Sequence, residues 1–318
     1  MRPLVLSERH FRVFEQPGTI SLRRRARRGT PVSIWVALAL LGPACTSQAG
    51  PRLPDSVSEA SGLVASRRHP GVFWTHNDSG DESRFFGVAA DGKLLATVAV
   101  VGARNVDWED IAIDDAGFLY LGDHGNNESA RRDLTIYRVP EPDPTQAPTS
   151  VTPDRVIRFH YPEQTRWPDP EEAFDAEALF WAQGKLYLLT KTRKSAATTL
   201  YRFDDLSGTR DLPLTRVGTF ETEADKKKGR RVTAADVTPD GRHLAVLTYH
   251  ALYLFERPAE GDNYLSKPLR RIGLDPDVFE QCEAVAWDGA DLVVANEQRA
   301  IFRLPRALTW KGDQWKGR

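Results

Sequence analysis

Short stretches of alternating hydrophobic and polar residues recur along the chain in a fixed order. Each recurrence has a similar opening, then a short apolar run and a third alternating stretch. Short β-type segments that repeat at a period of about 50 residues are typical of propeller blades. The five openings are Glu59–Leu63, Asp107–Ile111, Asp175–Leu179, Thr233–Val237 and Gln281–Val285.

This repeat predicts an all-β protein that consists of one β-propeller with four-stranded blades. Five openings favour five blades, with six as the alternative, and the propeller is expected to occupy residues 58–306, followed by a tail at 307–318. The last repeat shows only three clear runs. We therefore expect the lead-in at residues 46–57 to supply the closing strand, since a propeller protects its sheet edges by closure.

Carboxylates recur near the start of the first strand of these repeats, which lines the central channel of a propeller. The four are Glu109, Glu177, Glu283 and Asp236. The three glutamates share one position of the repeat, which we call the Glu column. If Ser61 and Ala235 hold this position in the first and fourth repeats, Asp236 lies one position later. Crowded like charges require protonation, a basic partner or a cation. Ca²⁺ suits such an oxygen-rich ring. The alternative is that these carboxylates accept backbone hydrogen bonds and latch neighbouring blades together.

A second group of polar residues follows the second strand of the first three repeats. Its candidate ligand-binding residues are Asn77, Asp78, Asp123, His124, Asn126 and Lys191. Asn, Asp and Gly also build turns for purely structural reasons, so turn formation and ligand contact both remain open here. His124 is expected to be an ordinary hydrogen-bonding residue, with metal ligation as the alternative. Lys191 could pair with the acids, bind an anionic group or belong to a solvated loop.

Composition excludes several classes of function. The 318 residues carry a formal net charge of −1 with 27% charged residues, which gives no overall field for nucleic acid or membranes. The basic run at 225–231 lacks interleaved aromatic residues and is interpreted as a solvated loop. The chain contains no Gly-X-Ser-X-Gly elbow, phosphate-binding loop or His-Glu-X-X-His zinc motif. The connection at 140–172 is expected to hold one outer strand at 155–159 within a lid or a simple insertion.

The first 45 residues are interpreted as an N-terminal extension with an export signal. A basic cluster at 23–28 precedes an apolar run at 31–41, and small residues follow. This order is typical of a secretory signal. The ending Leu41-Gly42-Pro43-Ala44-Cys45 resembles the lipobox of bacterial lipoproteins, which implies that Cys45 carries lipid. Cys282 would then be left without a disulfide partner, as a buried structural thiol.

Three phrases of the sequence resemble those of secreted bacterial propeller proteins. They are Ser58–Leu63, Trp74–Gly80 and Asp107–Ile111. More distantly, the chain resembles gluconolactonase-like propellers and phytase-like or esterase-like propellers. The lactonase resemblance implies a divalent cation on the axis, held by Glu59 or Glu109, Asn77 or Asn126, and Asp236.

These observations together predict an exported, lipid-anchored or periplasmic propeller of the bacterial envelope. We expect it to be a monomer that binds a small molecule, a glycan or an envelope protein at its axial or loop face. The competing hypothesis is a calcium-dependent hydrolase or lactonase that uses a metal-bound water. We expect no nucleic acid partner, and membrane attachment only through the lipid.

Overall fold

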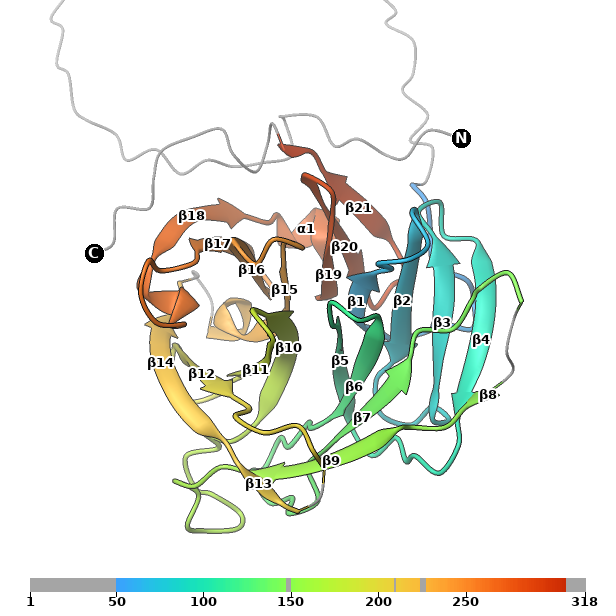
Figure 1. The fold of residues 1–318 in the computed structure, drawn as a ribbon. Helices are drawn as coiled ribbons and strands as arrows, with labels where there is room; N and C mark the ends of the chain where they lie inside the picture. The colour runs from blue at the N-terminus through green and yellow to red at the C-terminus, as the bar shows by residue number, and fades with distance from the viewer. Residues whose placement is uncertain (1–49, 147–149, 209, 224–226, 307–318) are drawn as a thin grey trace, which may run out of the picture.

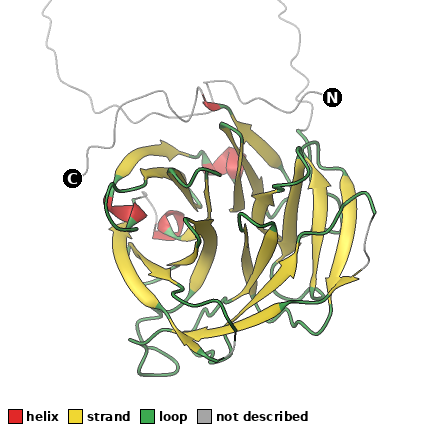
Figure 2. Ribbon diagram, in the orientation of Figure 1, coloured by secondary structure: helices red, strands yellow, loops and turns green. Residues whose placement is uncertain are grey.

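The computed structural model describes residues 50–146, 150–208, 210–223 and 227–306. In this part of the chain, five sheets are arranged as a ring around a central axis (Figure 1). Strands dominate, and the helical elements are single short turns between them (Figure 2). The prediction of an all-β, five-bladed propeller is therefore confirmed, and the six-bladed alternative is wrong.

Blades 1 and 2 are four-stranded antiparallel sheets, and each carries a short extra strand parallel to its outer edge. The extra strands are β8 (Ser150–Val151), beside β4, and β13 (Leu212–Pro213), beside β9. The predicted outer strand in the long connection is β9. Blade 1 contains β1 (Ala60–Ala65), β2 (Val72–Asn77), β3 (Arg84–Ala89) and β4 (Leu94–Val100). Blade 2 contains β5 (Trp108–Ile113), β6 (Phe118–Asp123), β7 (Thr135–Pro140) and β9 (Arg155–His160).

Blades 3 and 4 follow the same antiparallel order from the axis outward. Blade 3 contains β10 (Ala176–Ala182), β11 (Lys185–Thr190), β12 (Ala197–Arg202) and β14 (Thr215–Glu221). Blade 4 contains β15 (Val232–Val237), β16 (His243–Thr248), β17 (Ala251–Glu256) and β18 (Pro268–Gly273). The helical turns are η2 (Lys227–Arg230), η3 (Tyr264–Ser266) and α1 (Pro276–Phe279). None of the described helices is long and apolar enough to cross a membrane.

Blade 5 has three strands, β19 (Cys282–Asp288), β20 (Asp291–Asn296) and β21 (Ile301–Leu304). The chain just before blade 1 lies along the outer edge of blade 5, where Arg52 forms an antiparallel bridge with Ala300. Leu53 N donates to Arg299 O at 2.7 Å, and Ile301 N donates to Pro51 O at 3.0 Å. The first and last parts of the described chain are thus joined by backbone hydrogen bonds, which protects part of an otherwise open sheet edge.

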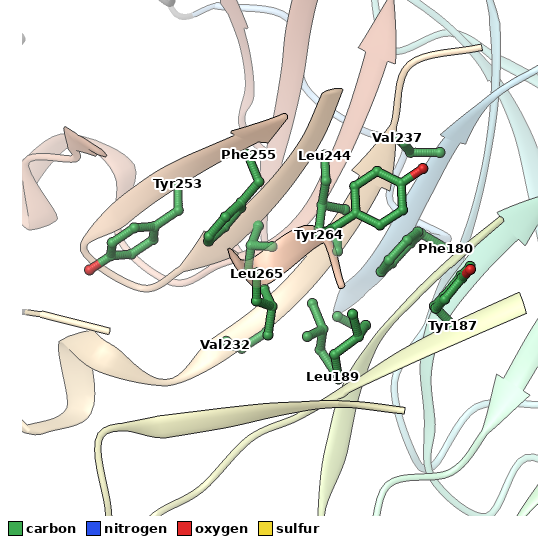
Figure 3. Packing of buried hydrophobic residues seen from close by; sticks show 14 of the residues in the cluster. Phe180, Tyr187, Leu189, Val232, Val237, Leu244, Tyr253, Phe255, Tyr264 and Leu265 are labelled. Atoms are coloured by element: carbon green, nitrogen blue, oxygen red, sulfur yellow. The ribbon is translucent and has the colours of Figure 1, made fainter. Parts of the chain in front are cut away.

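Apolar side chains fill the space between neighbouring blades. Five buried clusters occur, one at each interface between blades, and Figure 3 shows the cluster between blades 3 and 4. There Phe180 and Tyr187 of blade 3 pack against Tyr264, which follows β17 of blade 4. Because each sheet is covered on both faces, its inner strands are buried along their whole length, as β5 and β15 are. The inner strands β1, β5, β10, β15 and β19 surround the axis.

Each inner strand has a β-bulge near its start, and the bulges set which residues are equivalent. Ala176 pairs with Thr190 at the end of β11, and Val232 pairs with Thr248 at the end of β16. Thr233 is therefore the equivalent of Glu177. The sequence alignment of the fourth repeat, which placed Ala235 in the Glu column and Asp236 next to it, is wrong by two residues. The column is Ser61, Glu109, Glu177, Thr233 and Glu283.

Both cysteines were given roles in the sequence analysis. Cys282 is fully buried, and its Sγ lies 3.1 Å from Phe279 O. Burial raises the pKa of this thiol well above its usual value, which keeps it protonated and unreactive. Cys45 lies outside the described residues, so its lipidation stays a prediction.

Candidate axial metal site

The residue that follows the second strand lies beside the start of the inner strand in several blades. Asp78 N donates to Glu59 O at 3.0 Å, and Lys191 N donates to Asp175 O at 2.8 Å. Glu297 N makes the same bond to Gln281 O at 3.0 Å. Asp78, Lys191 and Glu297 thus occupy equivalent positions at one mouth of the channel, next to the residues that open the inner strands.

Two groups of carboxylates meet at this mouth, and Glu109 belongs to both. Asp78, Asp107 and Glu109 offer oxygens that lie within 4.8 Å of one another, and so do Glu109, Asp175 and Glu177. Glu109, Asp175 and Glu177 are buried, whereas Asp78 and Asp107 are partly exposed. We call these five residues the axial acid cluster.

Gly125 lets the chain pass directly against this cluster. A Cβ atom at Gly125 would lie 2.2 Å from Glu109 Oε1 and 2.4 Å from Asp107 Oδ2, so the two carboxylates would have to move to make room for any other residue. The turn that contains Gly125 is fixed by Arg131, whose Nη1 donates to Gly125 O at 2.8 Å. Arg131 also pairs with Asp123 at 3.0 Å. Glycine at this position therefore leaves the space that the Glu109 and Asp107 carboxylates occupy.

Lys191 neutralises one side of the axial acid cluster. Its Nζ lies 2.5 Å from Glu177 Oε1, and both residues are buried. Although burial opposes the charged ammonium, the attraction of Glu177 and the other acids raises the pKa of Lys191 well above its usual value. No lysine or arginine of the described residues forms an ion pair with Asp78, Asp107 or Glu109 within 4.0 Å. The Asp78–Asp107–Glu109 group is therefore the less neutralised of the two.

Burial and the crowding of negative charge raise the pKa values of several of these acids. Burial, followed by repulsion from Glu177, raises the pKa of Glu109 well above its usual value. Burial also raises the pKa of Glu177 to about 8, although Lys191 opposes the shift. For Asp107, burial and the charge of Asp78 raise the pKa to about 6. Such shifts show that the site binds protons near neutral pH, and a cation could replace those protons.

Glu283 lies on the other side of the channel mouth. Its Oε1 accepts a hydrogen bond from the Tyr249 hydroxyl at 2.5 Å, and Tyr249 lies beneath the Lys191 ammonium, 5.6 Å from it to the ring centre. Burial and the charge of Glu283 raise the pKa of Glu297 to about 7. Within the described residues, Glu283 is not part of either carboxylate group.

Asp236 does not join the carboxylate groups of the described residues. Its Oδ1 accepts from Val237 N at 2.8 Å, and its Oδ2 accepts from Trp287 N of blade 5 at 2.7 Å. These bonds match the latch alternative, in which a carboxylate joins neighbouring blades. The prediction that Asp236 points to the same centre as the glutamates depended on the wrong register of the fourth repeat.

Asp110 forms a second latch, which the sequence analysis missed. Its Oδ2 accepts from Leu179 N of blade 3 at 2.8 Å and from Ala235 N of blade 4 at 3.2 Å, while Oδ1 accepts from Ile111 N at 2.8 Å. Because blades 2 and 4 are not neighbours in the ring, the Asp110 carboxylate joins them across the channel. Burial raises its pKa well above the usual value despite these bonds.

The amides predicted as ligands have structural roles in turns. Asn77 Oδ1 accepts from Glu59 N at 3.2 Å, and its Nδ2 donates to Ser56 O at 2.9 Å. Asn126 Oδ1 accepts from Ala130 N and Arg131 N, both at 2.8 Å. Each amide therefore holds a loop at the channel mouth, and its role in ligand binding stays a prediction.

Asp123 and His124 also hold the chain at the mouth. Asp123 Oδ1 accepts from Asp107 N at 3.0 Å and pairs with Arg131. His124 is fully buried, with Nδ1 3.1 Å from Ala176 O. Burial lowers the pKa of His124 to about 3, so this imidazole is neutral. Of the six predicted loop residues, Asp78 and Lys191 are the two that reach the axial acid cluster.

Asp107 and Asp175 belong to the site, but neither was among the residues predicted from sequence. Both stand two residues before a glutamate of the Glu column, in the pattern Asp-x-Glu. Alternate residues of a strand point to the same side, and this spacing is the signal that could have identified them. All the side chains of the cluster offer carboxylate oxygens, the donors that hard divalent cations prefer. The cluster could therefore hold a metal ion.

Comparisons with known proteins found similar solved structures but no family. No family model matches the chain, and neither does any curated protein. Similar solved structures include the periplasmic gluconolactonase of Pseudomonas aeruginosa, with 18% identity, a TM-score of 0.40 and coverage of 74% of this chain and 64% of that chain.

Two further similar structures are a putative 6-phosphogluconolactonase of Bacteroides uniformis and virginiamycin B lyase of Staphylococcus aureus. The first has 15% identity, a TM-score of 0.39 and coverage of 77% of this chain and 65% of that chain. The second has 14% identity, a TM-score of 0.38 and coverage of 79% and 67%. The chain thus spans about two thirds of the length of these proteins. Lactonase propellers, which the sequence resembles, are among its structural neighbours.

Proposed function

We propose that this protein is a binding propeller whose axial acid cluster holds a divalent cation, with Asp78, Asp107 and Glu109 as its protein ligands. The observation that carries the proposal is the meeting of three carboxylates within 4.8 Å at the channel mouth. Isolated like charges at such distances repel one another, and a divalent cation converts the repulsion into attraction.

Charge compensation decides which of the two carboxylate groups is the cation site. In the group formed by Glu109, Asp175 and Glu177, the Lys191 ammonium already lies 2.5 Å from Glu177. Arg193 Nη2 lies 3.5 Å from Asp175 Oδ2. These two cations take the place that a metal would need, because a further positive charge there would be repelled. The group at Asp78 and Asp107 has no such partner and is also partly open to solvent.

Calcium is the ion that fits these donors best. It accepts six to eight oxygen ligands with tolerant geometry, whereas Mg²⁺ demands a near-octahedral set. Three carboxylates supply at most six oxygens, and in monodentate mode they supply three. The remaining positions would face the open mouth of the channel. A small molecule, a glycan or an envelope protein with oxygen donors would complete the coordination there.

The test is a calorimetric titration of the full chain with CaCl₂ after chelator treatment. We expect one calcium ion per chain, and Asp107→Asn should weaken the affinity at least about tenfold, because one charged ligand is lost. Asp91→Asn, a change in an exposed hairpin turn, is the matched control and should bind like the wild type. Equal calcium affinity in the Asp107→Asn and wild-type proteins would refute the proposed ligands.

A calcium-dependent hydrolase or lactonase is the second candidate function. One observation favours it: the pKa of Glu177 is raised to about 8 within the same cluster, and a carboxyl that titrates near neutrality can exchange protons with a reacting group. A metal ion bound here would supply a polarised water. A screen of lactones and phosphoesters with and without chelator separates the candidates. Turnover that is lost with chelator and in Glu109→Gln supports the enzyme, and calcium binding without turnover supports the binding protein.

We also propose that the protein is exported and carries lipid at Cys45. Export and lipidation are supported by the order of basic, apolar and small residues before Cys45, and they would place the propeller at the bacterial envelope. The test is incorporation of labelled palmitate by cells that express the full chain. We expect label in the membrane fraction for the wild type and none for Cys45→Ser. Equal labelling of the two proteins would contradict lipidation at this residue.

A further inference from the structure

A cavity lies away from the axis, where the end of β9 meets the loop that leads to blade 3. Its volume is about 430 Å³, within the range of roughly 300–1,000 Å³ that is usual for small-molecule sites. Its buried lining residues include Leu134, Phe159 and Tyr161, and Trp167 adds a further aromatic surface. None of these side chains belongs to the axial acid cluster.

A guanidinium group lies against the aromatic part of this cavity. The Arg132 guanidinium carbon is 3.9 Å from the centre of the Trp167 ring, a distance at which the planar cation stacks on the indole. The salt bridges of the described residues include Arg131, with Asp123 and Asp133, but not Arg132. Arg132 is exposed, so its charge is available to a ligand.

Two further polar side chains of the cavity have hydrogen-bond partners. His160 Nδ1 lies 2.6 Å from Asp211 Oδ2, and Gln164 Nε2 donates to Ser129 O at 2.6 Å. The Tyr161 hydroxyl is buried and has no hydrogen-bond partner among the described residues. Arg131 forms ion pairs with Asp123 and Asp133, so Arg132 is the arginine of the lining that has no ion pair among the described residues.

We propose that this cavity, centred on Arg132 and Trp167, is a binding site for a flat ring that carries a carboxylate, such as an aromatic acid. The ring packs against the aromatic surface and the guanidinium plane, because aromatic rings and guanidinium groups stack favourably. The carboxylate accepts hydrogen bonds from the edge of the Arg132 guanidinium, which presents donors in a planar fork. The site is separate from the proposed cation site and does not depend on it.

The experiment uses 2-naphthoate as the anionic probe and 2-naphthamide as its neutral counterpart. Both are titrated calorimetrically into the full chain. We expect saturable binding of one 2-naphthoate per chain and at least about tenfold weaker binding of the amide, because hydrogen bonds to a charged group are the stronger ones. Equal affinities for the acid and the amide, or no saturable binding of 2-naphthoate up to about 10 mM, would overturn the proposal.

Variants then locate the site. Arg132→Gln should weaken 2-naphthoate binding at least about tenfold, and Arg132→Lys should give an intermediate affinity because it keeps the charge but loses the planar stack. Arg242→Gln, at an exposed position elsewhere, should leave the affinity unchanged. Melting curves confirm that each variant is folded, and the comparison of the two probes on the wild type needs no variant. If Asp107→Asn abolishes the binding and Arg132→Gln does not, the ligand occupies the axial site and the proposal is wrong.

Discussion

At the scale of single residues, the central feature is that Lys191 acts as an internal counter-ion. Its ammonium lies 2.5 Å from Glu177, and only 5% of the residue is exposed. A buried charge that loses its partner is costly, by about 3–5 kcal/mol in measured cases. Lys191 thus compensates the side of the axial acid cluster formed by blade 3, and leaves the opposite side with an excess of negative charge.

Lys191→Met tests this role. At pH 9 and without calcium, where the Glu177 carboxyl is ionised in the wild type, we expect the substitution to lower the free energy of unfolding by about 3 kcal/mol, since Glu177 then stays buried without a counter-charge. Saturating calcium should recover part of the loss, because without the Lys191 charge the ion binds more tightly at Glu109, which both carboxylate groups share, and tighter binding to the folded state stabilises the variant more than the wild type. Urea unfolding with chelator and with calcium measures both effects. Lys93→Met, at an exposed position in a hairpin turn, is the control. A loss of equal size with and without calcium would contradict the counter-ion role.

At the scale of elements, the blades are joined by polar bonds at the Glu column as well as by apolar packing. Ser61 Oγ donates to Glu109 O at 2.5 Å, from blade 1 to blade 2. Thr233 Oγ1 donates to Cys282 O at 2.8 Å, from blade 4 to blade 5. The column therefore uses a hydroxyl to join the next blade in two repeats and a carboxylate at the channel mouth in three.

Thr233→Val measures the contribution of one such bond. Valine keeps the shape of threonine but leaves the buried Cys282 carbonyl without this donor, so we expect a loss of about 1–2 kcal/mol in the free energy of unfolding. Thr219→Val on the exposed edge of β14 should change stability by less than about 0.5 kcal/mol. Urea unfolding of the two variants gives the comparison. Equal stability of both would show that the hydroxyl does not join the blades.

The same column explains which parts of the site could be predicted from sequence. Five repeats, their strand order and the carboxylates Glu109 and Glu177 were recognisable because acidic residues recur before apolar strands. The fourth repeat was misaligned because Thr233 carries no charge, whereas Ala235-Asp236-Val237 imitates Glu109-Asp110-Ile111. The bulge at the start of each inner strand breaks the simple alternation of side-chain directions. The role of Asp110 as a latch across the channel could therefore be recognised only in the structure.

At the scale of the whole molecule, titratable groups at the axis make stability depend on pH. The acids have folded-state pKa values above their usual ones, about 6 for Asp107, about 7 for Glu297 and about 8 for Glu177. Between pH 4 and 8, the folded state therefore binds more protons than the unfolded state at these groups, and stability falls as pH rises. Buried His76 and His124 have lowered pKa values and act oppositely, but only below about pH 6.5.

The acids and the histidines contribute separately to the pH dependence of stability above pH 6.5, where the histidines are neutral in both the folded and the unfolded state. We expect the chelator-treated protein to lose stability between about pH 6.5 and 8, and the loss should shrink when calcium replaces the protons of the axial acid cluster. Urea unfolding at several pH values, with and without calcium, measures this slope. A stability that does not fall over this range without calcium would show that the axial acids are already ionised in the folded protein.

The most direct measurement is a crystal structure of the full chain grown with calcium, with anomalous scattering used to locate the ion. The account predicts one site at the channel mouth, with carboxylate oxygens of Asp78, Asp107 and Glu109 at about 2.3–2.6 Å from the ion and Lys191 still paired with Glu177. The absence of density for an ion at that position under saturating calcium would contradict the account. So would an ion bound elsewhere while these three carboxylates stay free.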